Sequence, residues 1–295
     1  MKRLVECVPN FSEGRRPEVL AEIVRAIASV AGALLLDHQM DPDHNRAVVT
    51  FAGPPEAVAE AALRAVGRAA ALIDLTQHSG VHPRMGATDV VPFVPLEGMT
   101  LEECVPLAHH VGEEIWRRFQ VPVYFYEAAA RSPERAALET IRRGARSSPR
   151  LLPDLGGPGL HPTAGATVVG ARRFLIAYNV LLATSDVEIA RRIARRVRAS
   201  SGGLPFVKAM GVLLSRPQPR AQVSMNLTNF EATPVHVAYE AVVREAAAEG
   251  VSIESSELIG LLPQRAFDMS PEFFRSVENF HPGLILENRL AEAAQ

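Results

Sequence analysis

Residues 78–89 read HSGVHPRMGATD and combine two histidines, an arginine and an aspartate with two glycines. Pro83 disfavours helical backbone at the residue before it, so we expect His82 to lie in a loop. A neutral imidazole on a loop can take up and return a proton near neutral pH, because its unperturbed pKa is about 6.5. The segment therefore predicts an acid–base site; its structural alternative is a turn whose histidines only bond to backbone.

Further polar side chains lie near the predicted strand ends in the first part of the chain. Asp37, Asp41 and Asp43 lie in or beside a polar loop that precedes Arg46, and Asn10 lies where a strand turns toward a helix. Carboxylates suit a cationic substrate group, and an arginine can bind a carboxylate through two hydrogen bonds. For the aspartates the alternative is a solvated turn, and for Asn10 it is a helix cap.

One order of elements, strand-helix-strand-strand-helix-strand, occurs twice along the chain. In the first part, hydrophobic periodicity predicts strands at 4–11, 33–37, 45–52 and 89–95 and helices at 17–30 and 55–73. In the second part it predicts strands at 174–182, 207–215, 221–227 and 256–262 and helices at 186–199 and 234–249. We therefore predict an α+β fold (an α/β sandwich) of two ferredoxin-like βαββαβ subdomains, with both helices of each on one sheet face.

An added helix-strand-helix unit, predicted at 101–119, 121–126 and 133–143, extends the first subdomain. Residues 144–165 are rich in Gly, Pro and Ser, and a loop of that length is typical of a linker or a binding loop. We place the two subdomains at residues 1–170 and 171–295. The aromatic residues after Pro271 are expected to cover the core or a partner.

Composition narrows the class of protein. A hydrophobic content of 47% with 22% charged residues is ordinary for a globular protein, and a net charge of −2 with 6% aromatic residues argues against nucleic-acid or membrane-surface binding. Cys7 and Cys104 supply neither a disulfide framework nor a metal-binding quartet, and suit a reducing compartment. Because no long apolar segment is present either, we expect a cytoplasmic location.

Six segments, in this order and spacing between about residues 3 and 263, resemble the formiminotransferase family. They are VECVPNFSEG at 5–14, DPDHNR at 41–46, HPRMGATD at 82–89, VPVYFY at 121–126, GATVVGARRFLIAYN at 165–179 and QVSMNL at 222–227. The resemblance implies transfer of the formimino group from N-formimino-L-glutamate to N5 of tetrahydrofolate, which gives 5-formiminotetrahydrofolate and L-glutamate. This reaction belongs to histidine degradation and one-carbon metabolism, with tetrahydrofolate as co-substrate and no metal.

The resemblance also implies a homodimer of formiminotransferase subdomains. In the vertebrate relatives a helical cyclodeaminase domain follows, for which this chain is too short, so we expect a separate cyclodeaminase to receive the product.

The family's site residues carry over onto matching positions. His82 matches the catalytic histidine and is expected to act as general acid and base. The folate-binding stretch matches Gly156, Gly157, Pro158, Gly159, Leu160, His161, Pro162, Thr163, Ala164 and Gly165. The candidates for substrate binding are Asn10, Arg46, Arg84 and Asp43, with Arg172 and Arg173 as further carboxylate-binding candidates.

Two positions depart from the family pattern. Ala164 stands where vertebrate relatives carry an aromatic residue, so stacking of the pterin there is not expected. Gln39 replaces an acid found in some members, which leaves open which carboxylate would face the amidinium.

Three alternatives stay open or are set aside. The first alternative is glutamate formyltransfer from N-formylglutamate or 5-formyltetrahydrofolate, whose transferred group carries an O where the formimino group carries an NH. The second is a non-catalytic folate-binding module, which would need no acid–base group. His78 and His82 have a spacing that suits metal ligands on a helix, but Gly80 and Pro83 disfavour a helix there, and no second ligand motif is present.

Overall fold

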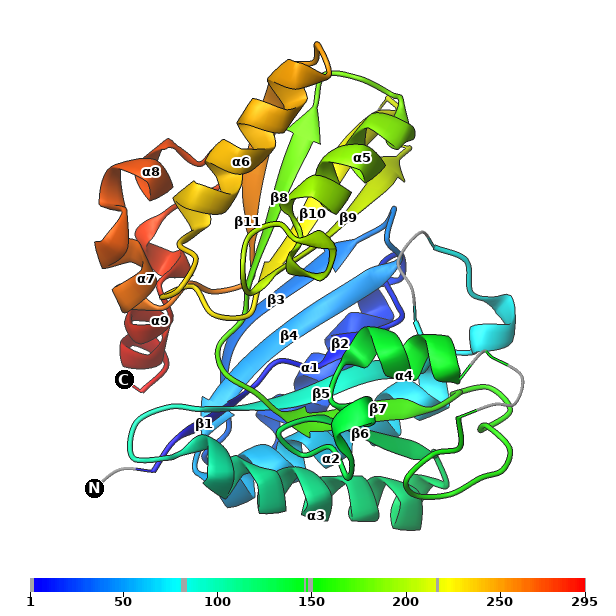
Figure 1. Ribbon diagram of the computed structural model, residues 1–295. Helices are drawn as coiled ribbons and strands as arrows, with labels where there is room; N and C mark the ends of the chain where they lie inside the picture. Colours follow the sequence, from blue (N-terminus) through cyan, green and yellow to red (C-terminus); the bar gives the residue numbers. More distant parts are fainter. Residues whose placement is uncertain (1–2, 81–83, 146, 148–150, 216–217, 295) are drawn as a thin grey trace. The chain divides into compact units, whose positions relative to one another are not determined.

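The computed structural model describes residues 3–80, 84–145, 147, 151–215 and 218–294. They form two compact units, Met1–Arg173 and Phe174–Gln295, and each contains its own β-sheet. The α+β class with two ferredoxin-like subdomains is confirmed (Figure 1).

The first unit is built on a mixed sheet. Its strands are β1 (Val5–Cys7), β2 (Asn10–Phe11), β3 (Leu34–Asp41), β4 (Arg46–Gly53), β5 (Thr88–Pro95), β6 (Val123–Glu127) and β7 (Thr167–Ala171). β1 and β2 both pair antiparallel with β4 on one side and with β5 on the other, and β3 pairs with β4. The strand order β3-β4-β1/β2-β5 is ferredoxin-like, and the parallel strands β7 and β6 extend it beyond β5.

Helices cover both faces of this sheet. They are α1 (Pro17–Ala28), α2 (Pro55–Leu72), α3 (Leu101–Phe119) and α4 (Leu138–Gly144), with 3-10 turns at Leu75–Gln77 and Pro133–Arg135. The main core joins α1, α2 and α3 to one face through side chains such as Ile23, Phe51 and Ile115, all fully buried. A smaller core on the opposite face joins Ile141 of α4 to Tyr124 of β6. Burying a large apolar side chain stabilises a fold by about 1.5–3 kcal/mol, so both faces hold the sheet in place.

Four sequence predictions in this unit differ from the structure. The strand predicted at 4–11 is two short strands, β1 and β2, separated by Val8 and Pro9. β3 continues to Asp41 and not only to residue 37, because its pairing with β4 runs as far as Asp41 opposite Arg46. β7 was not predicted: a short strand that is parallel to both neighbours and buried on both faces lacks the polar alternation that marks a strand. The helix predicted at 133–143 is a 3-10 turn followed by the short α4.

The second unit has an antiparallel sheet of β8 (Ile176–Leu182), β9 (Val207–Leu214), β10 (Arg220–Leu227) and β11 (Ile253–Ile259) in the order β11-β8-β10-β9. This is again the ferredoxin-like order. α5 (Val187–Val197) and α6 (Val235–Ala248) pack on one of its faces, and a 3-10 turn at Ala199–Ser201 follows α5 (Figure 1).

The C-terminal segment completes the core of the second unit. It contains α7 (Gln264–Met269), α8 (Pro271–Ser276), a 3-10 turn at Pro282–Leu284 and α9 (Leu286–Ala293). The ring of Phe273 lies 5.4 Å from that of Tyr239 on α6 and 5.8 Å from that of Tyr178 on β8, measured between centroids. The aromatic residues of this segment therefore cover the unit's own core.

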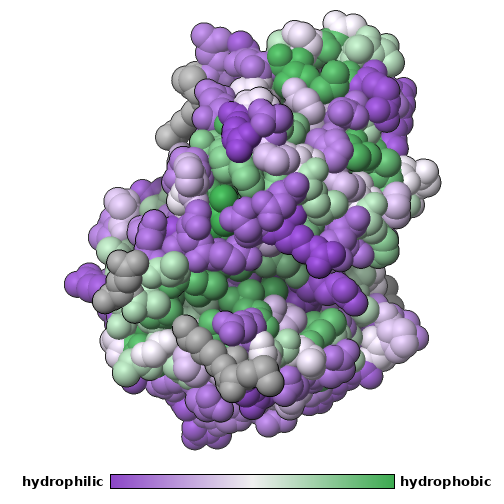
Figure 2. Space-filling view, turned by 90° about the vertical axis from the view of Figure 1, so that its left-hand side faces the viewer, coloured by the Kyte–Doolittle hydropathy of each residue, from purple (hydrophilic) through white to green (hydrophobic). Residues whose placement is uncertain are grey.

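On the face seen in Figure 2, hydrophilic residues occupy most of the surface and hydrophobic residues form smaller patches between them. A helix capable of crossing a lipid bilayer does not occur among the residues that the structure describes.

Candidate active site

The polar segment 78–89 is anchored on its N-terminal side by the turn before β4. The Nε2 atom of His78 lies 3.0 Å from the backbone oxygen of Asn45, and the Asn45 side chain donates a hydrogen bond of 2.9 Å to the backbone oxygen of Ser79. Burial and the charge of Arg84 lower the pKa of His78, which favours the neutral imidazole. His82 itself lies in 81–83, outside the described residues, so its position is not part of this geometry.

Arg84 binds back onto the same segment. Its guanidinium donates to the backbone oxygen of His78 at 2.7 Å and to that of Gly80 at 3.4 Å. These two hydrogen bonds tie Arg84, which follows residues 81–83, to the backbone of His78 and Gly80, which precede them. This geometry gives Arg84 a structural task that the sequence did not suggest, and its predicted substrate binding stays a prediction.

Asp89 anchors the C-terminal side of the segment. Its Oδ1 atom accepts a hydrogen bond of 2.5 Å from the backbone N–H of Met85, and its Oδ2 atom pairs with Arg142 of α4. Asp89 is 3% exposed. Sequence reasoning assigned a role to neither residue: Asp89 closes the HPRMGATD motif, but nothing in the sequence places Arg142 beside it.

Arg46 is a second arginine that interacts electrostatically with Asp89. Its pKa is lowered to about 10, chiefly by burial, while Asp89 and Asp41 raise it and Arg142 lowers it further. An arginine with this pKa is still charged at neutral pH, and a buried charge is stabilised by an anion. Arg46 therefore lies in a site with cationic character.

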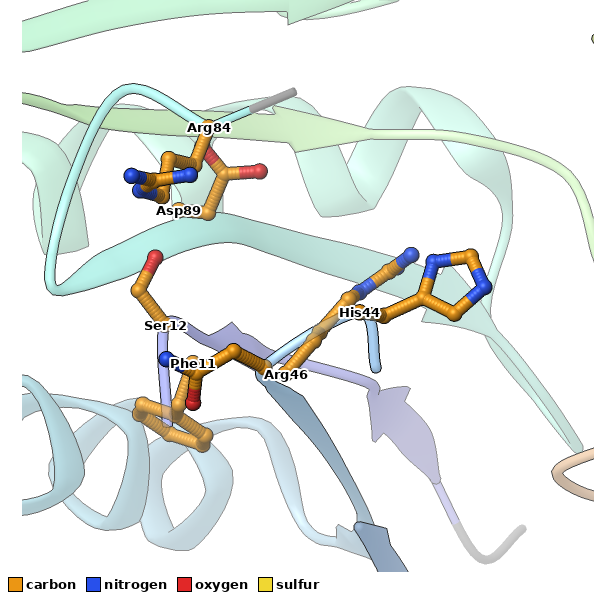
Figure 3. A pocket seen from close by; sticks show the side chains of 7 residues that line it. Phe11, Ser12, His44, Arg46, Arg84 and Asp89 are labelled. Atoms are coloured by element: carbon orange, nitrogen blue, oxygen red, sulfur yellow. The ribbon is translucent and has the colours of Figure 1, made fainter. Parts of the chain in front are cut away.

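A small pocket joins these side chains (Figure 3). Figure 3 shows Arg84 on the segment before β5 and Asp89 on β5 itself, with His44 in the turn before β4 and Arg46 at the start of β4. The residues that line the pocket are Phe11, Ser12, His44, Asn45, Arg46, Arg84 and Asp89. Two arginines against one aspartate leave the lining with excess positive charge, which favours a carboxylate ligand.

The predicted aspartates fall in different places. The Oδ1 atom of Asp41 accepts the backbone N–H groups of Asp43 and His44, both at 2.8 Å, so Asp41 holds the turn together. Asp37 and Gln39 lie within β3 and not in the loop. Asp43 lies in the turn itself, and its substrate contact stays a prediction.

Asn10 does not cap the following helix. Its Nδ2 atom donates to the backbone oxygen of Val8 at 2.9 Å, and α1 begins after Arg16 without a side-chain cap. Glu13 instead accepts the backbone N–H groups of Arg15 and Arg16. The Oδ1 atom of Asn10 is buried and has no hydrogen-bond partner among the described residues, so the capping alternative is wrong and ligand binding stays open.

Comparison with known proteins decides the family. A family model described as the formiminotransferase domain, N-terminal subdomain, matches residues 4–172, and the formiminotransferase domain model matches residues 177–290.

The chain belongs to the formiminotransferase family.

Relatives in this family match over the whole chain. The chain is 43% identical to a glutamate formimidoyltransferase of Streptococcus pyogenes serotype M1, with 98% of this chain and 99% of the relative covered. It is 44% identical to a glutamate formimidoyltransferase of Thermoplasma acidophilum, with 99% and 98% covered. A formimidoyltransferase-cyclodeaminase of Gallus gallus is 45% identical over 93% of this chain, which spans 53% of that relative.

The stretch that matches the folate-binding segment of the formiminotransferase family divides into two parts. In the second part, the backbone N–H groups of His161 and Gly165 bond to each other's backbone oxygens at 2.9 and 3.0 Å, and that of Ala164 bonds to the His161 ring at 3.0 Å. The oxygen of Ala164 accepts the N–H of Ala87 at 2.9 Å. This part is therefore a closed turn against the motif segment, and its main-chain donors are already used.

The first part of this stretch lies elsewhere. A Cβ on Gly156 would come within 2.7 Å of the ring of Trp116 on α3, so Gly156 lies directly against that ring. Four residues after it are exposed: Gly157, Pro158, Gly159 and Leu160. The structure therefore brings only His161–Gly165 to the motif segment.

Arg172 and Arg173 do not join the pocket. Burial raises the pKa of Tyr126 to about 12, while the charge of Arg172 and a hydrogen bond from Arg172 act to lower that pKa. Arg172 also donates to the backbone oxygen of Arg173 at 2.9 Å. These contacts place Arg172 beside Tyr126 at the end of β6. Among the residues that the structure describes, no group of three or more histidines, cysteines or carboxylates could hold a metal ion.

Proposed function

We propose that this protein is a glutamate formimidoyltransferase, which transfers the formimino group from N-formimino-L-glutamate to N5 of tetrahydrofolate. The observation that carries the proposal is similarity over nearly the full length to two glutamate formimidoyltransferases, at 43% and 44% identity. Both family domains are present in order, so the parts that the transferase needs are all represented.

The reaction requires two proton transfers. N5 of tetrahydrofolate attacks the amidine carbon, and the bond between that carbon and the glutamate nitrogen breaks after a tetrahedral intermediate. The attacking nitrogen loses one proton and the departing glutamate nitrogen gains one. A single imidazole can carry out both steps, and we assign them to His82.

The described residues around the motif segment support this assignment. His78, Arg84 and Asp89 anchor the two sides of residues 81–83 through hydrogen bonds to backbone groups. A general base needs a fixed position relative to its substrate, and such bonds to the flanking backbone would provide it. We propose the pocket beside Arg46 as the site for a carboxylate of the glutamate donor.

We further propose that tetrahydrofolate contacts the exposed part of the 156–165 stretch, and that Asn10 and Asp43 contact the donor. Exposed glycines allow close approach of a ligand to the backbone, and the buried Oδ1 atom of Asn10 can accept a hydrogen bond from an N–H of the donor.

We also propose that the protein is a cytoplasmic homodimer. Two free, buried cysteines suit a reducing compartment. Light scattering on the purified protein measures the oligomeric state directly, and a monomeric mass would overturn the dimer.

The function is tested with purified protein, tetrahydrofolate and N-formiminoglutamate, by following 5-formiminotetrahydrofolate through its absorbance. N-formylglutamate is run in parallel as donor. Turnover of the formimino donor is the expected result; turnover of the formyl donor alone would assign glutamate formyltransfer, and folate binding without turnover would assign a binding module.

The catalytic assignment is tested with His82→Ala, which should lower kcat by about 10²–10⁴-fold. His110→Ala, a histidine exposed on α3, is the matched control and should turn over like the wild type. Wild-type turnover by His82→Ala would remove His82 from the mechanism.

A further inference from the structure

The first unit has an apolar groove along one side, between α1 and the edge strand β3. Among the residues that the structure describes, β4 is the one strand that pairs with β3, and α1 packs against both strands. The groove is lined by the flank of α1 from Pro17 to Arg25 and by His38 and Met40 of β3. All of these residues belong to the first unit. We call this surface the α1–β3 groove.

α1 is apolar over more of its circumference than its own core requires. Four of its residues are buried toward the sheet: Val19, Leu20, Ile23 and Ile27. Along the flank that borders the groove, Pro17 and Ala21 are exposed and Val24 is half-buried, at the spacing of one helix face. A surface helix usually carries polar residues beside its core stripe, so a second apolar flank indicates a further packing partner.

The charges beside the groove carry opposite signs at its two ends. Glu18 and Arg25 lie two turns apart on the same side of α1. Arg25 pairs with Glu22 of its own helix, but Glu22 also pairs with Arg68 of α2, so this cluster keeps one excess positive charge. Glu18 is exposed and has no ion pair among the residues described. The flank therefore offers a negative charge near its start and a positive charge near its end.

This arrangement is complementary to itself. A two-fold axis perpendicular to α1, between Ala21 and Glu22, pairs α1 antiparallel with the same helix of a second copy. The axis places Glu18 of each copy opposite Arg25 of the other, so two ion pairs form. Val24 of each helix then falls between Pro17 and Ala21 of the other helix, as a side chain packs into a groove between neighbouring turns. The chain itself thus supplies both the apolar surface and the charges that the groove requires of a partner.

We propose that the α1–β3 groove is the contact surface of a homodimer, in which α1 of each copy packs antiparallel against α1 of the other. The inference rests on the homodimer of the proposed function and names its surface. α1 has 12 residues and β3 has 8, which makes them about 18 Å and 27 Å long. With a helix layer and a strand layer about 20 Å high together, the surface measures on the order of 500 Å² on each copy. The total is near the lower limit of about 1,000 Å² for a specific interface, so the dimer should dissociate on dilution.

Analytical ultracentrifugation of the full-length protein over a range of concentrations tests the proposal by measuring the Kd of the dimer. Glu18→Arg and Arg25→Glu should each raise this Kd about 10–100-fold, because each replaces two attractive contacts by two repulsive ones. The double variant Glu18→Arg/Arg25→Glu exchanges the charges and restores both ion pairs, so its Kd should return to within about 3-fold of the wild-type value. Ala21→Glu places a charge at the centre of the contact and should leave the protein monomeric.

Glu56→Arg is the matched control. Glu56 occupies the same position in α2 as Glu18 does in α1, since each is an exposed acid that follows the first proline of its helix. Glu56 does not line the α1–β3 groove, so this variant should dimerise like the wild type. Circular dichroism spectra that match the wild type show that each variant is folded.

Three results would overturn the proposal: a wild type that is monomeric at every concentration, wild-type dimerisation by both single variants, or weakening by both without recovery in the double variant. The last result would mean that the two charges do not meet. The function fails in a different way. If the wild type turns over and no variant changes its dimer, the surface is wrong and the function stands. If the variants change the dimer as expected but the wild type does not turn over, the function is wrong and the surface stands.

Discussion

Asp89→Asn tests whether the buried pair with Arg142 holds the motif segment in place. The side chains of Asp89 and Arg142 are 5% and 17% exposed, so water screens their interaction little. Removing one partner of a buried ion pair costs about 3–5 kcal/mol, mainly because the other charge is left buried. Asparagine can still accept the N–H of Met85, so we expect the lower end of that range, a loss of about 3 kcal/mol. The pKa of Arg46 should fall further, because Asp89 raises it.

Urea unfolding followed by tryptophan fluorescence measures this loss in the relevant unit. Trp116 is the chain's single tryptophan and lies on α3 of the first unit, so the signal reports that unit alone. Arg142→Met and the double variant complete a thermodynamic cycle, whose coupling free energy should exceed about 1 kcal/mol. As a control, Arg3→Gln removes an exposed pair with Glu103 and should cost less than about 1 kcal/mol.

The same variant should also lower kcat, because Met85 loses a charged anchor beside residues 81–83. A loss of unfolding free energy below about 1 kcal/mol, with no coupling to Arg142→Met, would refute the reasoning. In that case the pair would contribute no more to stability than an exposed ion pair does, and the segment would depend on its other hydrogen bonds.

Three further expectations concern single side chains. Burial and Arg84 lower the pKa of His78, so the unfolded chain binds a proton first as the pH falls below about 6.5, and the free energy of unfolding should decrease there. His78→Gln should flatten that part of the stability profile measured by urea unfolding, and an unchanged slope would contradict it. Burial raises the pKa of the Cys7 thiol well above its usual range and that of Cys104 to about 11. A thiol reagent at pH 8 should therefore label neither cysteine before denaturant is added. Rapid labelling of the native protein would contradict this expectation. Arg84→Lys should lower kcat with little change in the KM for N-formiminoglutamate, because Arg84 bonds to backbone of the motif segment; a raised KM with unchanged kcat would assign it to substrate binding instead.

The elements predicted best from sequence are those with local signals at both ends. α3 occupies residues 101–119 as predicted, because Thr100 and Glu103 form a capping box at its start and Gln120 ends it in a left-handed conformation. β7 has no such signals. Its Thr167–Ala171 segment follows a glycine-rich stretch and is buried on both faces, so only its pairing with β5 and β6 identifies it as a strand.

In the candidate site, too, some features could be predicted from local sequence and others could not. The types and spacing of residues in the motif segment predicted a polar site with an imidazole, and the family resemblance made Arg46 a candidate for substrate binding. They did not show that Arg84 bonds to the segment's own backbone or that Asn10 leaves the helix uncapped. Those facts depend on side-chain direction, which local sequence does not specify.

By itself, then, the amino-acid sequence determined the order of elements, the ferredoxin-like class and the family, because periodicity and long motifs are properties of neighbouring residues. Tertiary structure alone decided which distant side chains meet. Arg142 and Asp89 are 53 positions apart in the sequence. They meet because α4 packs against side chains of β5, β6 and β7 on one face of the sheet.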